Sequence, residues 1–198
     1  MTIFRHRLSG PGAAGDVWTT TLHSQSASTL ANAHTAFVTL VSGFITTTLA
    51  PMWPNDISSN SVITDQLDAT TGKNVSQTSS TVSLPGTGAG ATLPGRDALV
   101  IGLRTASSTR RGRGRMFWPA PDSTHLTASG LLLSADATAL ASAFAARLNT
   151  FKSVSIGCIW HDDLKSFDNI VTVTVGNVLG TQRRRTNKVV TSYASATV

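Results

Sequence analysis

Cysteine, charge and long hydrophobic runs are all scarce in this chain of 198 residues. The single cysteine, Cys158, excludes an intramolecular disulfide framework and a cysteine-based zinc cluster. No run of about 18 apolar residues is visible, so no segment is expected to span a membrane. Charged residues make up 13 % of the chain, against roughly 25 % in typical proteins. Because disorder requires high net charge and low hydrophobicity, a hydrophobic share of 40 % predicts a folded chain.

Hydroxyl side chains take the place of the missing charges. The sequence contains 29 threonines and 23 serines. Threonine and the valines found beside it are β-branched residues that favour strands, so this composition is typical of a β-rich protein. A surface with so few charges is also one that other subunits can cover.

The N-terminal residues 1–7 alternate between polar and apolar types and do not have the pattern of a signal peptide. No lipidation or retention signal is visible at either end. We therefore expect the protein to act in a cytoplasm, or to leave it as part of a larger particle.

Basic residues are concentrated in two short segments that contain no acidic residue, 104–115 and 183–188. These segments hold nine of the sixteen basic residues, and the rest of the chain is slightly acidic. The nine are Arg104, Arg110, Arg111, Arg113, Arg115, Arg183, Arg184, Arg185 and Lys188. The guanidinium fork binds phosphates and carboxylates bidentately, so these residues are candidate contacts to nucleic acid or to neighbouring subunits. Solvated turns are the alternative interpretation.

Hydrophobic periodicity predicts a single domain over residues 1–198 that combines strands with two helices. Apolar residues three and four apart predict helices over 28–48 and 135–151, the first capped by Ser26 or Ser28. The predicted strands cover residues 2–9, 16–23, 60–70, 74–83, 98–105, 113–118, 154–160 and 170–179. A flexible loop rich in Gly, Pro and Thr is expected at 84–95, and a basic tail from 181 onward.

The elements follow the order strand, strand, helix, strand, strand, and then the same order again. The halves show no clear repeat at the level of residues, so we interpret the order as architecture and not as duplication. The predicted fold is mainly β: a jelly-roll-like β-sandwich with two helices inserted in its connections, for which α+β is the alternative description. The expected core combines one face of a central strand with side chains from both helices: Leu99, Ile101, Leu103, Phe37, Phe44, Phe144 and Leu148.

Side chains that perform catalysis are few and scattered. His161-Asp162-Asp163 is the only dense group, and because adjacent strand residues point to opposite faces, a polar turn is the preferred interpretation. His34 is expected to be a hydrogen-bonded core residue, and Cys158 an inert one. The other histidines look isolated: His6, His23 and His125. We therefore expect no enzymatic activity, no catalytic residue, no metal, no cofactor and no small-molecule substrate.

Four tryptophans, Trp18, Trp53, Trp118 and Trp160, are interpreted as core residues in preference to platforms for stacking bases. Two functions from different classes then remain. Low charge and a hydroxyl-rich β surface favour a self-assembling structural protein. The two arginine segments favour a nucleic-acid-binding module, because they can neutralise phosphates. Both descriptions meet in a capsid protein.

Three segments resemble virion structural proteins of the capsid type found in small viruses and tailed phages. They are Ala98–Thr105, the strand start Arg113-Gly114-Arg115 and the tail Thr181–Lys188, so the similarity covers residues 95–190. The resemblance implies a jelly-roll-like shell or virion component. Capsid proteins of small viruses often begin with a long basic arm, whereas this N-terminus has only Arg5 and Arg7. This departure leaves room for an external or connector role.

The sequence is thus interpreted as a non-enzymatic virion structural protein, a self-assembling capsid protein that forms the shell. The first alternative is a minor phage structural component such as a head-decoration, connector or tail protein. The second is a free-standing nucleic-acid-binding protein. The expected partners are other copies of the chain in a large symmetric assembly, viral genomic nucleic acid is left open, and no membrane is expected. The expected location is the virion, after assembly in the host cytoplasm.

Overall fold

The computed structural model describes residues 1–11, 17–52, 57–84, 98–105, 113–119, 121–129, 131–154, 156–159, 170–178 and 191–198. The flexible loop expected at 84–95 lies outside this part beyond Leu84. The basic stretch 181–190 of the expected tail lies outside it as well, as do Trp53, Trp160 and the His161-Asp162-Asp163 group.

In each half of the chain, two strands precede one long helix in the sequence and further strands follow it. The first half consists of β1 (Thr2–Pro11), β2 (Val17–Ser26), α1 (Leu30–Phe44), the short helical segments η1 (Ile45–Leu49) and η2 (Ala50–Met52), β3 (Ile57–Leu67) and β4 (Asn74–Leu84). The second half consists of β5 (Ala98–Thr105), β6 (Arg113–Pro119), η3 (Ser123–His125), α2 (Ser134–Val154), β7 (Ile156–Ile159), β8 (Ile170–Val178) and β9 (Thr191–Thr197).

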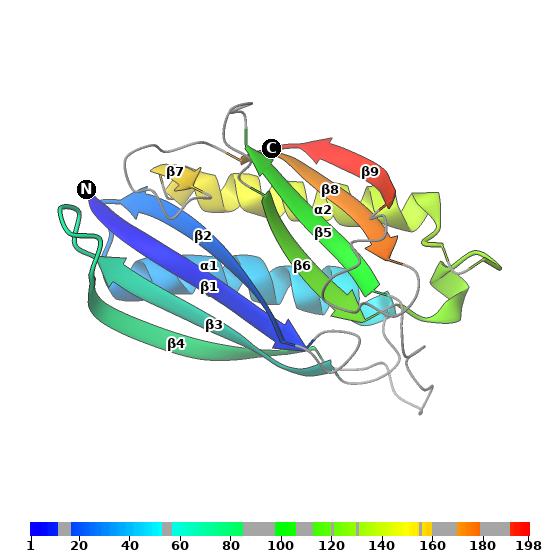
Figure 1. Cartoon of the computed structure of the whole chain (residues 1–198), viewed down its shortest axis with the longest axis horizontal. Helices are drawn as coiled ribbons and strands as arrows, with labels where there is room; N and C mark the ends of the chain where they lie inside the picture. The colour runs from blue at the N-terminus through cyan, green and yellow to red at the C-terminus, as the bar shows by residue number, and fades with distance from the viewer. Residues whose placement is uncertain are drawn as a thin grey trace.

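The strands form two antiparallel sheets with the orders β4-β3-β1-β2-β7 and β6-β5-β8-β9. Apart from β7, which joins the first sheet next to β2, both sheets place their four strands in the same order. Figure 1 shows the strands as one layer with α1 and α2 behind it. The mainly β fold with two helices in the connections is therefore confirmed.

The jelly-roll arrangement is not confirmed. Where a sandwich would pack a second sheet, α1 packs on β3 and β4 of the first sheet, and α2 packs on β8 and β9 of the second. The two helices also contact each other. Helices provide the apolar cover here because their buried stripes are wide enough to bury one face of each sheet.

Helix α1 begins at a cap other than the two predicted serines. Thr29 Oγ1 accepts from the Asn32 backbone N–H at 3.2 Å, whereas Ser26 Oγ accepts from the Ser28 backbone N–H at 3.0 Å and stays in the preceding turn. At its other end, α1 continues into η1, which is a π-helical turn. The hydroxyl of Thr46 donates to the Ser42 carbonyl at 2.8 Å, a contact that competes with the backbone ladder at this point.

The uncharged segment Leu30–Met52, made of α1, η1 and η2, is long and apolar enough to cross a membrane by length and composition. The prediction from the sequence that no segment is long and apolar enough to span a membrane is therefore wrong by this criterion. Its side chains Phe37, Phe44 and Leu49 are buried in the core, and core helices satisfy the same criterion. We therefore interpret it as a core helix.

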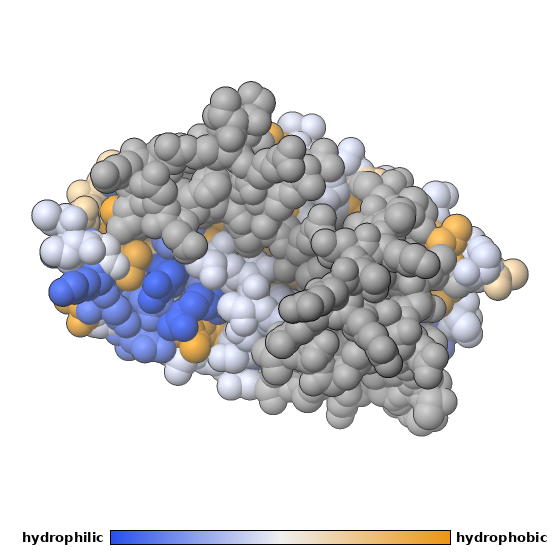
Figure 2. All heavy atoms as spheres, viewed as in Figure 1, coloured by the Kyte–Doolittle hydropathy of each residue, from blue (hydrophilic) through white to orange (hydrophobic). Residues whose placement is uncertain are grey.

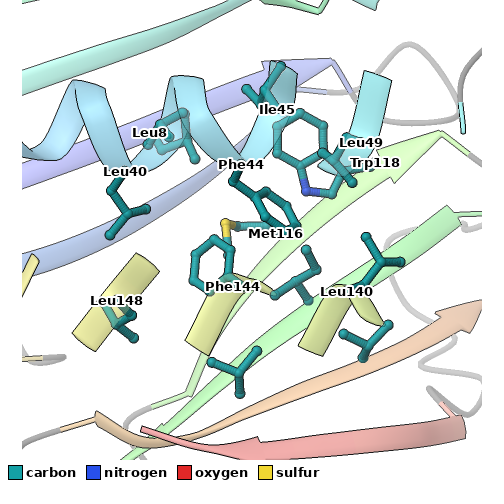
Figure 3. Packing of buried hydrophobic residues seen from close by; sticks show 14 of the residues in the cluster. Leu8, Leu40, Phe44, Ile45, Leu49, Met116, Trp118, Leu140, Phe144 and Leu148 are labelled. Carbon is teal, nitrogen blue, oxygen red and sulfur yellow. The ribbon is translucent and has the colours of Figure 1, made fainter. Parts of the chain in front are cut away.

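Aromatic rings join the two halves at equivalent places. Trp18 on β2 meets Trp118 on β6 with ring centroids 5.0 Å apart, and Phe44 on α1 meets Phe144 on α2 at 4.8 Å. Figure 3 shows Phe44 and Phe144 facing each other beside Met116. The predicted core positions are confirmed, since all of them are at most 4 % exposed: Leu99, Ile101, Leu103, Phe37, Phe44, Phe144 and Leu148.

Truncation of Phe144 should lower the free energy of unfolding by about 3–5 kcal/mol, because the change removes the ring from a closed helix–helix contact. Urea denaturation of Phe144→Ala and the parent measures this difference. Val75→Ala is the control, because Val75 is 62 % exposed and its truncation should change the stability by less than about 0.5 kcal/mol. Equal melting of Phe144→Ala and the parent would contradict the packing of α2.

Candidate functional site

Three arginines of the first predicted segment lie in one β-hairpin. Arg104 in β5 and Arg113 in β6 are register partners, and Arg115 is the partner of Gly102. The ladder thus brings the backbone of these three residues together at one end of the second sheet. The remaining predicted contacts lie outside the described residues: Arg110, Arg111, Arg183, Arg184, Arg185 and Lys188.

A different charged cluster occupies the outer face of the first sheet, the face opposite the helices. Alternation along β1 turns Phe4, His6 and Leu8 toward the core and turns Arg5 and Arg7 to the outer face. Figure 2 shows strongly hydrophilic side chains gathered on this face over the region of β1 and β3 in Figure 1.

Asp65 of β3 binds both arginines of this cluster. Arg5 Nε donates to Asp65 Oδ2 at 2.8 Å, and Arg7 Nη2 donates to Oδ1 at 3.0 Å. Asn74 Nδ2 also donates to Oδ1, at 3.2 Å. The Asp65 side chain has no exposed surface, whereas those of Arg5 and Arg7 are 34 % and 33 % exposed. Two partly exposed cations therefore lie above one buried carboxylate, and the cluster has a net charge of +1.

A second polar group lies on the core face of the same sheet. His6 contacts Thr64 Oγ1 through Nδ1 at 3.0 Å and Ser24 Oγ through Nε2 at 2.8 Å. His34 of α1 contacts the same Thr64 Oγ1 through Nδ1 at 2.9 Å, and Ser80 Oγ through Nε2 at 2.8 Å. The interpretation of His34 as a hydrogen-bonded core residue is confirmed. The interpretation of His6 as isolated is wrong, because strand pairing brings residues 58 positions apart into contact.

The hydrogen bonds of these five residues form one continuous chain. The Thr64 hydroxyl has a single hydrogen, so it donates to one imidazole Nδ1 and accepts from the other. With both histidines neutral, every ring nitrogen has a partner, and all bonds in the chain run in the same direction. The network is therefore complete without any charge.

Burial keeps His6 neutral. Desolvation, followed by the proximity of His23 and His34, lowers the pKa of His6 to about 3. Burial also lowers the pKa of His34. The rings of Phe37 and Phe151 lie 4.7 Å and 5.5 Å from the His6 ring, which gives the imidazole an apolar surrounding.

The pairing of Ser24 with His6 has the composition of a nucleophile and its base, but not the accessibility of one. Both side chains are fully buried, and the second nitrogen of His6 contacts a hydroxyl where a catalytic triad has a carboxylate. Among the residues that the structure describes, no group of three or more metal-ligating side chains occurs. These polar residues hold α1 to the sheet.

Two described carboxylates outside this cluster, Asp68 and Asp136, have structural partners. Asp68 accepts from the backbone N–H groups of Thr70 and Thr71 in the turn between β3 and β4, and these bonds lower its pKa. His125 Nδ1 lies 3.0 Å from Asp136 in the first turn of α2, so the interpretation of His125 as isolated is wrong. The sequence did not reveal this contact because His125 and Asp136 are 11 residues apart and are brought together by a loop.

Sequence reasoning missed the Arg5–Asp65–Arg7 cluster. The alternation of Arg5 and Arg7 in a predicted strand was a signal that both share a face. The carboxylate that joins them lies about 60 residues away, and only the β1–β3 register, which places Arg5 opposite Asp65, identifies it.

Comparison with protein-family models, with curated proteins and with solved structures finds no match to this chain. The function must therefore be argued from its own residues and surfaces.

The free energy of unfolding should fall by about 2–3 kcal/mol when the pH is lowered from about 7.5 to about 4.5. The unfolded chain binds a proton at His6 near pH 6.5, whereas the folded chain does so only near pH 3. The folded state therefore binds fewer protons across this range, and acid favours unfolding. Urea denaturation at both pH values measures the difference.

His6→Asn removes this titrating group, so its free energy of unfolding should depend less on pH over the same range, although it should be lower at neutral pH. A parent protein that is equally stable at both pH values would contradict the burial of a neutral imidazole at His6.

Proposed function

We propose that this chain is a self-assembling virion structural protein whose copies form the shell of a capsid. The observation that carries the proposal is the pair of uncharged strand edges at the outer ends of the two sheets. The resemblance of residues 95–190 to capsid-type proteins agrees with it. The expected location in a virion, after assembly in the host cytoplasm, belongs to the same proposal.

Strand β4 forms one outer edge of the first sheet. Its 11 residues, Asn74–Leu84, include no charged residue and no proline. At the outer edge of the second sheet, the 7 residues of β9 share these properties. Natural proteins that stay monomeric protect exposed edges with lysine, proline or pronounced bulges, because an open edge is a template for pairing. Both edge ladders contain register shifts, but no described strand pairs with the outer side of β4 or β9, and two such edges at opposite ends suit a subunit that binds its own copies.

The helical face supports the same proposal. Helix α1 contains no charged residue, and its exposed side chains are small. The exposed positions of α2 also carry small side chains, such as Thr138, Ser142 and Ala146. Small uncharged side chains reduce the desolvation cost of covering a surface. This face can therefore take part in contacts between subunits at a low energetic cost.

The proposal does not depend on a jelly-roll fold, because lateral pairing requires only sheets with open edges. A minor virion component, such as a head-decoration, connector or tail protein, would use the same edges in a smaller assembly. A free-standing nucleic-acid-binding protein is the alternative from another class, and the exposed arginines on the outer face of the first sheet favour it. Assembly state separates these alternatives.

Purified protein should form homo-oligomers that bury well over about 1,000 Å² at each contact. Light scattering at high micromolar concentration in physiological salt measures the mass, and negative-stain microscopy distinguishes shells from rings or tubes. A strictly monomeric protein under these conditions would overturn the proposal, and one that also binds nucleic acid would support the alternative.

A lysine on the open edge should block assembly. Ser79 is an exposed residue in the middle of β4, and Ser79→Lys places a charge where a second strand would dock. Ala69→Lys is the matched control. Ala69 is exposed in the turn before β4, so a lysine there adds the same charge away from the edge. We expect light scattering to show smaller species for Ser79→Lys only. Unchanged assembly of both variants would show that β4 is not the contact.

A further inference from the structure

We infer that the outer face of the first sheet binds the phosphate backbone of a nucleic acid through Arg5 and Arg7. This binding face differs from the two arginine segments that the sequence suggested. The inference deepens the proposed function, because it names the surface of a virion subunit that faces the genome. The binding itself does not depend on assembly.

The outer face is the side of the sheet that neither long helix covers. Both α1 and α2 lie behind the strands in Figure 1, and the side chains of Arg5 and Arg7 keep about a third of their surface exposed. In Figure 2, which has the same view, strongly hydrophilic side chains of this face are visible at the surface. A ligand can therefore reach the guanidinium groups from solvent.

Asp65 uses most of its acceptor sites, whereas each arginine uses few of its donors. Asp65 accepts three hydrogen bonds, from Arg5, Arg7 and Asn74. Each arginine gives Asp65 a single N–H out of the five that a guanidinium carries. Within the described part of the chain, Arg7 Nε is buried and has no hydrogen-bond partner. That buried Nε cannot be reached from solvent, but the partly exposed guanidinium groups carry further N–H donors that Asp65 does not use, and these can bind another anion.

The geometry favours phosphate as that anion. The buried carboxylate fixes both guanidinium groups, so less side-chain entropy is lost when a ligand binds. Phosphate presents several acceptor oxygens that match the planar fork of an arginine. One arginine would be enough to neutralise the charge of Asp65. The second arginine therefore gives the cluster its excess positive charge.

The neighbouring side chains indicate binding that does not read the base sequence. The register places Thr21 beside Arg7, and Gln77 beside Asp65. Hydroxyl and amide groups of this kind contact phosphate and sugar oxygens. Among the described residues of this face, no exposed aromatic ring is available for stacking on a base. Affinity should then come from charge and depend steeply on salt.

The experiment compares the salt dependence of binding in matched variants. Arg5→Gln/Arg7→Gln/Asp65→Asn removes both cations together with the carboxylate, so no buried charge loses its partners. Arg147→Gln is the control: it changes the net charge by the same amount on the helical side, where Arg147 donates to Thr47. The probe is a fluorescein-labelled oligouridylate, titrated between about 50 and 200 mM salt. A labelled duplex distinguishes single-stranded from double-stranded ligands.

We expect the log–log slope of affinity against salt to become shallower by about 1.4 in the triple variant, or about 0.7 for each lost contact. Arg147→Gln should keep the parental slope. A folded triple variant with the parental slope would overturn the inference, and so would an equal loss in Arg147→Gln. Light scattering on the same samples separates this result from the proposed function, since a protein that assembles with an unchanged slope refutes only the phosphate site.

A second measurement needs no variant. Phenylglyoxal modifies exposed arginines, and mass spectrometry of the parent protein locates the modified sites. Bound oligouridylate should protect Arg5 and Arg7 and leave Arg147 as reactive as before. Equal reactivity of Arg5 and Arg7 with and without the oligonucleotide would refute the site even if the triple variant fails to fold.

Discussion

The contact between α1 and α2 at Phe44 and Phe144 is the interaction on which the rest of this structure depends. Each sheet has one apolar face, and neither sheet covers the other. Helix α1 covers the apolar face of the first sheet, and α2 covers that of the second. The rings of Phe44 and Phe144, whose centroids are 4.8 Å apart, hold the two halves in one core. Both long helices lie on one side of the strands, and on the other side of the first sheet the side chains of Arg5 and Arg7 stay partly exposed.

The two halves share a strand order and meet through equivalent elements. The ring of Trp18 on β2 contacts the ring of Trp118 on β6, and the ring of Phe44 on α1 contacts the ring of Phe144 on α2. Contacts between equivalent parts have the form of an isologous interface, in which one surface is matched by its own counterpart. The repeated order of elements was visible in the sequence. The symmetric contacts were not, because the residues that make them are 100 positions apart.

Periodicity in the sequence was sufficient to predict most elements, because alternation and helical spacing follow from burial of one face. It also predicted the core, including Phe44 and Leu99. It could not predict which strands become neighbours. The joining of β7 to the first sheet, the contact of His6 with Thr64 and the burial of Asp65 between two arginines all depend on register between distant segments. Most residues of the two predicted arginine segments lie outside the described part, so their role remains a prediction.

The proposed assembly edge and the proposed phosphate face do not compete for surface. Edge pairing at β4 or β9 extends a sheet within its own plane and does not use the face opposite the helices. Copies that associate in this way present their Arg5–Asp65–Arg7 clusters on surfaces that continue across the assembly. One cluster has a net charge of only +1, so we expect it to bind a phosphate weakly. Many clusters on one particle bind one polymer together, and the linked contacts multiply the affinity. Assembly should therefore raise the affinity of this sparsely charged chain for a nucleic acid.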